Sequence, residues 1–146
     1  MNRTKLLGSA AAVVVTVTGG ACAGNSSKVA AAAPRATAAL SEWSVTLSSS
    51  TFRAGKYAFT IKNDGKIEHE LIAVRTTVAL ADLPLKADGD VNEEDPSVPN
   101  STDGDNIASG KTQARTITLT PGTYVYMCNL PGHFKAGMHE LITVTA

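Results

Sequence analysis

Apolar and polar residues alternate along the chain from about residue 40 onward, with a period of two. In the first such segment Trp43, Val45 and Leu47 share one side, with polar residues between them. The same alternation covers residues 57–62 and 116–120. Each pattern predicts a strand of an antiparallel sheet that buries its apolar face and exposes its polar face.

Further short apolar runs, rich in valine, isoleucine, threonine and tyrosine, cover residues 69–75, 124–128 and 140–144. Turn signals separate the runs: Asn63-Asp64-Gly65, Pro121-Gly122 and Pro131-Gly132. The spacing predicts an all-β fold, a β-sandwich of about seven to eight strands without a long helix.

The alternation of apolar and polar residues stops over residues 77–111. This segment predicts a long acidic loop, with at most one short helical turn or edge strand. Such a loop is either functional or a solvated insertion. Its carboxylates are Asp82, Asp88, Asp90, Glu93, Glu94, Asp95, Asp103 and Asp105.

Composition and charge argue against several classes of protein. With 146 residues the chain has room for one domain, and its formal net charge of zero argues against a nucleic-acid-binding surface. Two cysteines are too few for a disulfide framework or a four-cysteine zinc site. No apolar run reaches the roughly 18 residues of a transmembrane helix.

The N-terminus has the layout of a secretory signal, with basic Arg3 and Lys5 ahead of an apolar stretch over residues 6–17. A core helix is the alternative, although its valines and threonines suit a helix poorly. Cleavage after Ala23 would give a leader over residues 1–23, whereas Gly19-Gly20-Ala21-Cys22 resembles a bacterial lipobox that would leave Cys22 lipidated. We expect an exported protein with a flexible tether over residues 24–39 and a folded domain over residues 40–146.

The candidate chemistry lies near the C-terminus, where Cys128, His133 and Met138 follow one another at intervals of five residues around the Pro131-Gly132 turn. His69 begins an upstream strand just after a turn. Two imidazoles, a thiolate and a thioether form the ligand set of a blue copper site, with a His₂Cys plane and a weak axial methionine.

Other interpretations of these residues remain open at this point. Cys128 alone is equally typical of an inert buried thiol, and a Cys128–His133 nucleophile pair lacks an orienting third group. Zinc is disfavoured because methionine is a poor zinc ligand. Met127 is expected to point away from Cys128 on the strand, and His139 is interpreted as an ordinary exposed histidine.

The sequence resembles the cupredoxins, the small blue copper proteins, in particular the plastocyanin/azurin-like and sulfocyanin-like group. Cys128-Asn129-Leu130-Pro131-Gly132-His133 matches the Cys-x-x-Pro-Gly-His core of the ligand loop, and Gly137-Met138 matches its end. Residues 63–71 and 121–126 match the segments that lead to the first histidine and to the cysteine. The resemblance covers about residues 40–146.

This resemblance implies a Greek-key β-sandwich with one type 1 copper, held strongly by His69, Cys128 and His133 and weakly by Met138. It implies histidine binding through Nδ1, a surface position for Nε2 of His133, and hydrogen bonds to the cysteine sulfur from the N–H groups of Glu70 and Leu130. Glu70 stands where many cupredoxins have an asparagine that ties the ligand segments together. Either Glu70 or Asn129 is left to supply that tie.

The function expected from these observations is an exported one-electron carrier in the periplasm or on the outer face of the membrane, without catalytic residues and monomeric. Copper storage or delivery is the alternative. The expected partner is a redox protein, a cytochrome or a copper oxidase or reductase, that docks near His133; nucleic acid is not expected, and a membrane is contacted only through Cys22. An apolar patch around the imidazole would receive this partner, and the acidic loop would steer it. The expected patch residues are Leu130, Pro131, Phe134, Ala136 and Gly137.

Overall fold

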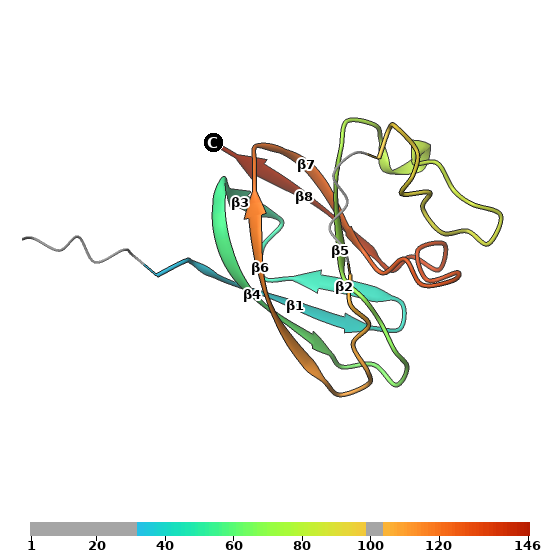
Figure 1. Cartoon of the computed structure of the whole chain (residues 1–146), viewed down its shortest axis with the longest axis horizontal. Coiled ribbons are helices and arrows are strands. Elements are labelled where there is room, and N and C mark those ends of the chain that lie inside the picture. Colours follow the sequence, from blue (N-terminus) through green and yellow to red (C-terminus); the bar gives the residue numbers. More distant parts are fainter. Residues whose placement is uncertain (1–31, 99–103) are drawn as a thin grey trace, which may run out of the picture. The chain divides into compact units, whose positions relative to one another are not determined.

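The computed structural model describes residues 32–98 and 104–146, and nearly all regular structure in them is β (Figure 1). One short 3₁₀ turn, η1 (Leu80–Asp82), accompanies the strands. The strands are β1 (Arg35–Ser41), β2 (Ser44–Leu47), β3 (Thr51–Arg53), β4 (Gly55–Asn63), β5 (Ile72–Thr76), β6 (Thr112–Leu119), β7 (Gly122–Met127) and β8 (His139–Thr145). The all-β prediction and the predicted number of strands are confirmed.

The strands form two four-stranded sheets, with the orders β2-β1-β4-β6 and β3-β8-β7-β5. Neighbours are antiparallel except for two pairs, β1 with β4 and β3 with β8, which are parallel. Consecutive strands repeatedly belong to different sheets, so the chain crosses from one sheet to the other as in a Greek-key sandwich. The segment between β4 and β5, which carries His69, comes close to the segment after β7, which carries Cys128.

The main core lies between the two sheets. Phe59 of β4 stacks on Tyr126 of β7 with ring centroids 5.8 Å apart, which joins the sheets at their centre. Val45, Leu47 and Ile117 are also buried, as their alternation with polar residues predicts. Each large apolar side chain buried in this way contributes roughly 1.5–3 kcal/mol to stability.

The fold begins earlier in the chain than the sequence indicates. Residues 35–39, the last part of the expected tether, belong to β1, where they pair in parallel with β4. Ala36 and Ala38 are buried beside Leu40, because alternate positions of this strand face the core. Alanine is a weak hydrophobic signal, so this strand resembles a linker in the sequence. The expected leader over residues 1–23 and the rest of the tether up to residue 31 lie outside the described residues.

The alternation predicts that Trp43 points into the core, but the structure places it elsewhere. The pairing of β1 with β2 closes at Ser41 and Ser44, so Glu42 and Trp43 form the turn between the two strands. The Trp43 side chain is 47% exposed. The two residues at this turn are therefore free to contact the loops at the same end of the sandwich.

The acidic connection, defined as residues 77–111, is more than a solvated insertion in its described part. Leu83, Val91 and Val98 are buried against residues of β5 and β7, and they form a second apolar cluster with Met127 and Phe134. An isolated bridge between Leu85 and Val91 closes one turn of this segment. The described segment thus packs over a face of the β3-β8-β7-β5 sheet that would otherwise be exposed.

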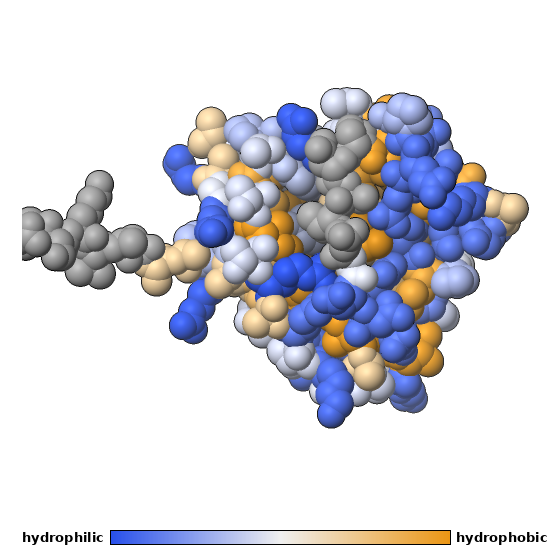
Figure 2. All heavy atoms as spheres, viewed as in Figure 1, coloured by the Kyte–Doolittle hydropathy of each residue, from blue (hydrophilic) through white to orange (hydrophobic). Residues whose placement is uncertain are grey.

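The surface of this region is mostly hydrophilic, with hydrophobic residues visible between the polar ones (Figure 2). Asp82, Asp88, Glu94 and Asp105 are exposed, whereas Asp90 is buried. Across residues 32–98 and 104–146, no helix is long and apolar enough to cross a membrane.

Candidate metal centre

The two histidines reach the centre from different parts of the fold. His69 precedes β5, and its backbone is fixed by two hydrogen bonds with Ile107: its N–H donates over 3.2 Å and its carbonyl accepts over 2.7 Å. Cys128 follows the last residue of β7, and His133 lies in the loop between β7 and β8. The strand pairing therefore places His69 opposite the ligand loop.

The ligand loop, residues 128–138, is closed by its own backbone hydrogen bonds. The N–H of Cys128 donates to the carbonyl of Met138 over 3.0 Å, and the N–H of Met138 donates to the carbonyl of His133 over 3.1 Å. Gly132 adopts a φ of 78°, a left-handed conformation that glycine tolerates best. These contacts return the chain to its starting point, so Met138 packs in the same buried cluster as Cys128.

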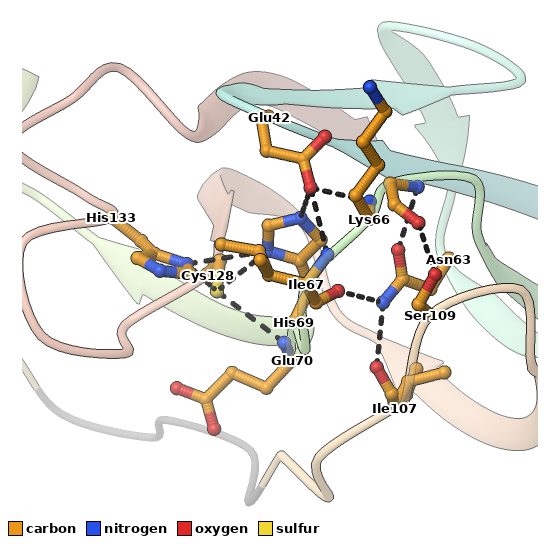
Figure 3. A network of polar contacts seen from close by, with 11 residues as sticks. Glu42, Asn63, Lys66, Ile67, His69, Glu70, Ile107, Ser109, Cys128 and His133 are labelled. Carbon is orange, nitrogen blue, oxygen red and sulfur yellow. Dashed lines mark hydrogen bonds and ion pairs between the residues drawn. The ribbon is translucent and has the colours of Figure 1, made fainter.

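The donor atoms of His69, Cys128 and His133 converge (Figure 3). The two Nδ1 atoms lie 3.3 Å apart, and the Cys128 Sγ lies 3.2 Å from Nδ1 of His133 and 3.9 Å from Nδ1 of His69. One donor from each residue lies within 4.8 Å of the others. The Nδ1 atoms are therefore the histidine atoms that face the sulfur, as the resemblance implies.

The chemistry of this donor set suits copper. His69, Cys128 and Met138 are fully buried, and His133 is 9% exposed. Three strong donors, two nitrogen and one sulfur, are preorganised beside a buried thioether, which is the arrangement typical of a type 1 copper centre. Burial to this extent leaves little room for the water ligands that a catalytic metal keeps.

Two backbone N–H groups point at the Cys128 sulfur. The Glu70 N–H donates a hydrogen bond to Sγ over 3.4 Å, and the Leu130 N–H donates another to the same atom. Burial raises the pKa of the thiol, and these two N–H groups lower it in part. Both N–H groups expected from the resemblance are thus at the sulfur, where such contacts tune a bound metal.

The tie between the ligand segments is supplied by Glu70. Its Oε1 accepts a hydrogen bond from the Asn129 N–H over 3.1 Å. The Asn129 side chain instead joins the acidic connection: its Oδ1 accepts from the Val91 N–H, and its Nδ2 donates to the Val91 carbonyl and to Glu93. Burial raises the pKa of the Glu70 carboxyl, which is 8% exposed.

Another link from the acidic connection reaches the ligand loop through Asp90. Its Oδ1 accepts a hydrogen bond from the Gly132 N–H over 2.9 Å, and the residue is only 6% exposed. Asp90 and Glu93 are therefore parts of the support of the metal centre. The sequence indicates acidity in this segment but not which carboxylates are structural.

The turn between β1 and β2 also contacts the site, which sequence reasoning missed. Glu42 Oε1 accepts hydrogen bonds from the N–H groups of Lys66 and Ile67 and lies 3.6 Å from Nε2 of His69. Burial and the nearby His133 lower the pKa of His69, whereas Glu42 raises it. Trp43 packs edge-on against His133. No motif in the sequence signals these contacts, because the turn lies far from the ligand loop in the chain.

The structure also tests the expectations for Met127, His139 and Phe134. Met127 packs in the second apolar cluster, on the opposite side of the strand from Cys128, as expected. His139 is partly buried rather than fully exposed, with its ring 4.9 Å from that of Phe134, and burial lowers its pKa. Phe134 itself is 6% exposed, so its assignment to a surface patch is wrong. It faces the cluster under the acidic connection instead.

Comparisons with known proteins agree with this geometry. The family described as copper binding proteins, plastocyanin/azurin family, matches residues 48–145. Auracyanin-B of Chloroflexus aurantiacus is 57% identical over 28 residues, a stretch that covers 19% of this chain and 12% of that protein.

Solved structures share the fold at lower identity. A reduced auracyanin from the photosynthetic bacterium Roseiflexus castenholzii has a TM-score of 0.53 at 21% identity, over 79% of this chain and 98% of the other. Rusticyanin from Thiobacillus ferrooxidans has a TM-score of 0.53 at 20% identity, over 76% of both chains. The family match, the fold and the donor set together show that the chain belongs to the plastocyanin/azurin family of cupredoxins and is a blue copper protein.

Proposed function

We propose that the protein is a one-electron carrier in which His69, Cys128 and His133 bind copper strongly and Met138 binds it weakly. The observation that carries the proposal is the convergence of three buried donors that the fold holds in place. Bound copper supplies the redox chemistry by cycling between Cu(I) and Cu(II). No residue of the chain then needs to form or break a bond with a substrate.

The surroundings of the donors suit electron transfer because they resist rearrangement. The backbone of His69 is paired with Ile107, and the ligand loop is closed between Cys128 and Met138. Glu70 joins the two segments through Asn129. Donors held in this way keep their positions when the charge of the metal changes, and a small rearrangement favours fast transfer.

Copper storage or delivery is the alternative, and voltammetry distinguishes the two functions. A carrier gives a reversible one-electron couple and keeps its metal through repeated cycles. A delivery protein releases copper in one oxidation state, so the couple fades as cycling proceeds. Retention of copper in both states supports the carrier. Progressive loss to a chelator in one state contradicts it.

The proposed partner is another redox protein, met by a monomer of this chain at the end of the sandwich where His133 lies. Pro131, Ala136 and Gly137 are exposed there, and Leu130 is partly exposed. Electron-transfer complexes use small interfaces that dissociate quickly. The exposed carboxylates of the acidic connection would draw a basic partner toward this end.

We further propose export, with Cys22 as the site of a lipid anchor that keeps the protein at the outer face of a membrane. The basic and apolar N-terminus and the lipobox-like Gly19-Gly20-Ala21-Cys22 support this proposal. Mass spectrometry of the mature protein purified from its native membranes tests it. A diacylated chain that begins at Cys22 is expected, and an unmodified chain that begins at Gly24 contradicts it.

A further inference from the structure

The His133 imidazole, whose Nε2 the family resemblance places at the surface, has an aromatic neighbour in this chain. His133 is only 9% exposed, and Trp43 lies against it with ring centroids 5.0 Å apart and an interplanar angle of 75°. The Trp43 side chain is itself 47% exposed. One indole ring thus extends from a candidate copper ligand to the solvent.

Trp43 is held in this position by its neighbour. Glu42 Oε1 accepts hydrogen bonds from the N–H groups of Lys66 over 2.6 Å and Ile67 over 3.0 Å (Figure 3). On its other side, the Trp43 carbonyl approaches Gly137 of the ligand loop, where an added Cβ would lie 4.0 Å from the oxygen. The turn is therefore anchored to the segment that leads to His69, and it lies beside the ligand loop that carries His133.

We propose that Trp43 is the outermost group on the electron route. The partner contacts the indole, and the electron passes between the partner and the centre through the contact of Trp43 with His133. This inference rests on the proposed carrier function. Tunnelling rates fall steeply with distance, and they fall faster through a gap than through packed atoms. An indole in contact with the imidazole therefore couples the centre to the surface better than a solvent gap would.

The chemistry of the indole also indicates the kind of partner surface. Tryptophan is common among the residues that contribute most to binding, because it buries a large rigid area at little cost in conformational entropy. We infer a partner that presents an apolar patch around the edge of its own redox group. Trp43 is not oxidised: one electron leaves the reduced centre and enters the oxidised one, without transfer of a proton.

Electron self-exchange between copies of the copper-loaded protein tests the route without an identified partner. One copper is oxidised and the other reduced, and line broadening in NMR spectra of mixed samples gives the rate. High ionic strength screens the repulsion between the exposed carboxylates of the acidic connections of two copies. Trp43→Leu removes the aromatic contact, Trp43→Phe keeps part of it, and Leu141→Ala is the control, since Leu141 is 49% exposed on β8.

We expect Trp43→Leu to slow self-exchange by about tenfold or more, Trp43→Phe to slow it less, and Leu141→Ala to leave it unchanged. The blue absorption and the reduction potential should stay as in the wild type. An unchanged rate in Trp43→Leu overturns the inference. A slower rate accompanied by an altered blue absorption also overturns it, because Trp43 would then shape the centre instead of connecting it.

Tryptophan fluorescence gives an independent test of the contact, because Trp43 is the sole tryptophan of the chain. Copper(II) loading of the wild type should quench its emission strongly. Emission unaffected by copper contradicts the contact between Trp43 and the centre. If the wild type shows no blue absorption and no reversible couple, the carrier function itself fails, which is a different result from normal self-exchange in Trp43→Leu.

Discussion

Glu42 Oε1 lies 3.6 Å from Nε2 of His69, a ring nitrogen that is buried and has no hydrogen-bond partner among the residues that the structure describes. The pKa of Glu42 is lowered by hydrogen bonds from backbone N–H groups, first its own and then those of Lys66 and Ile67. A charged carboxylate therefore lies next to Nε2 of His69. At this distance the carboxylate acts on the histidine through its charge, and a negative charge close to a ligand favours the more highly charged state of a bound metal.

Glu42→Gln should raise the reduction potential. Loss of the negative charge disfavours Cu(II) relative to Cu(I), and a tenfold change in that preference corresponds to about 59 mV for a one-electron couple. Voltammetry at constant pH measures the shift. The control is Glu94→Gln, which removes an exposed charge of the acidic connection. A potential that is unchanged or lower in Glu42→Gln contradicts the role of the carboxylate.

Glu70→Ala should weaken copper binding by roughly 10–100-fold, because it removes the link to Asn129 that joins the two ligand segments. Competition with a chelator of known affinity measures the loss. Glu70→Gln is the matched control, since its amide oxygen can still accept the Asn129 hydrogen bond. Wild-type affinity in the alanine variant would show that this contact does not support the centre.

The candidate ligands could be predicted from the sequence because they lie in short segments with characteristic spacing. Cys128, His133 and Met138 share one loop, and its turn is marked by Pro131-Gly132. The alternation of apolar and polar residues likewise predicted the central strands. Local patterns of this kind survive in the fold because each strand keeps one face toward the core.

The remaining features depend on contacts between distant segments. Trp43 continues an apolar alternation yet lies in a turn, and Phe134 looks like a surface residue until the acidic connection is placed over it. Leu83 and Val91 are too few and too scattered to predict a packed segment. Glu70 supplies a tie that the family commonly builds from asparagine, and only the folded structure shows its partner.

The exposed carboxylates of the acidic connection should affect encounter rates without changing the centre. A triple variant, Asp82→Asn, Asp88→Asn and Glu94→Gln, keeps the shape of each side chain. At low salt we expect slower oxidation by cationic cobalt complexes, with a flatter dependence on ionic strength, and an unchanged blue absorption. Stopped-flow kinetics measures the rates. Identical rates in the variant and the wild type contradict steering.

Asp90→Ala should behave differently, because Asp90 bonds to the Gly132 N–H from a buried position. Leaving that N–H without a partner costs roughly 1–3 kcal/mol. Thermal unfolding of the apoprotein should show this loss in Asp90→Ala and not in the triple variant. Equal stability of both variants would show that the hydrogen bond between Asp90 and Gly132 does not stabilise the fold.

Met138→Leu should keep copper bound and raise the reduction potential, because the lost thioether is a weak donor that favours Cu(II). His69→Ala and His133→Ala should disturb the absorption spectrum far more. Metal analysis after gel filtration, combined with voltammetry, separates the two effects. Loss of copper from Met138→Leu as complete as that from a variant without the cysteine contradicts the weak axial role.

The absorption spectrum of the oxidised, copper-loaded protein tests the central claim most directly. Charge transfer from the Cys128 sulfur to Cu(II) should give an intense blue or blue-green colour that disappears on reduction and returns on reoxidation. Cys128→Ser should abolish this band while the fold is retained, as checked by circular dichroism. A wild-type protein that stays colourless after copper(II) loading at neutral pH would contradict the assignment of a type 1 centre.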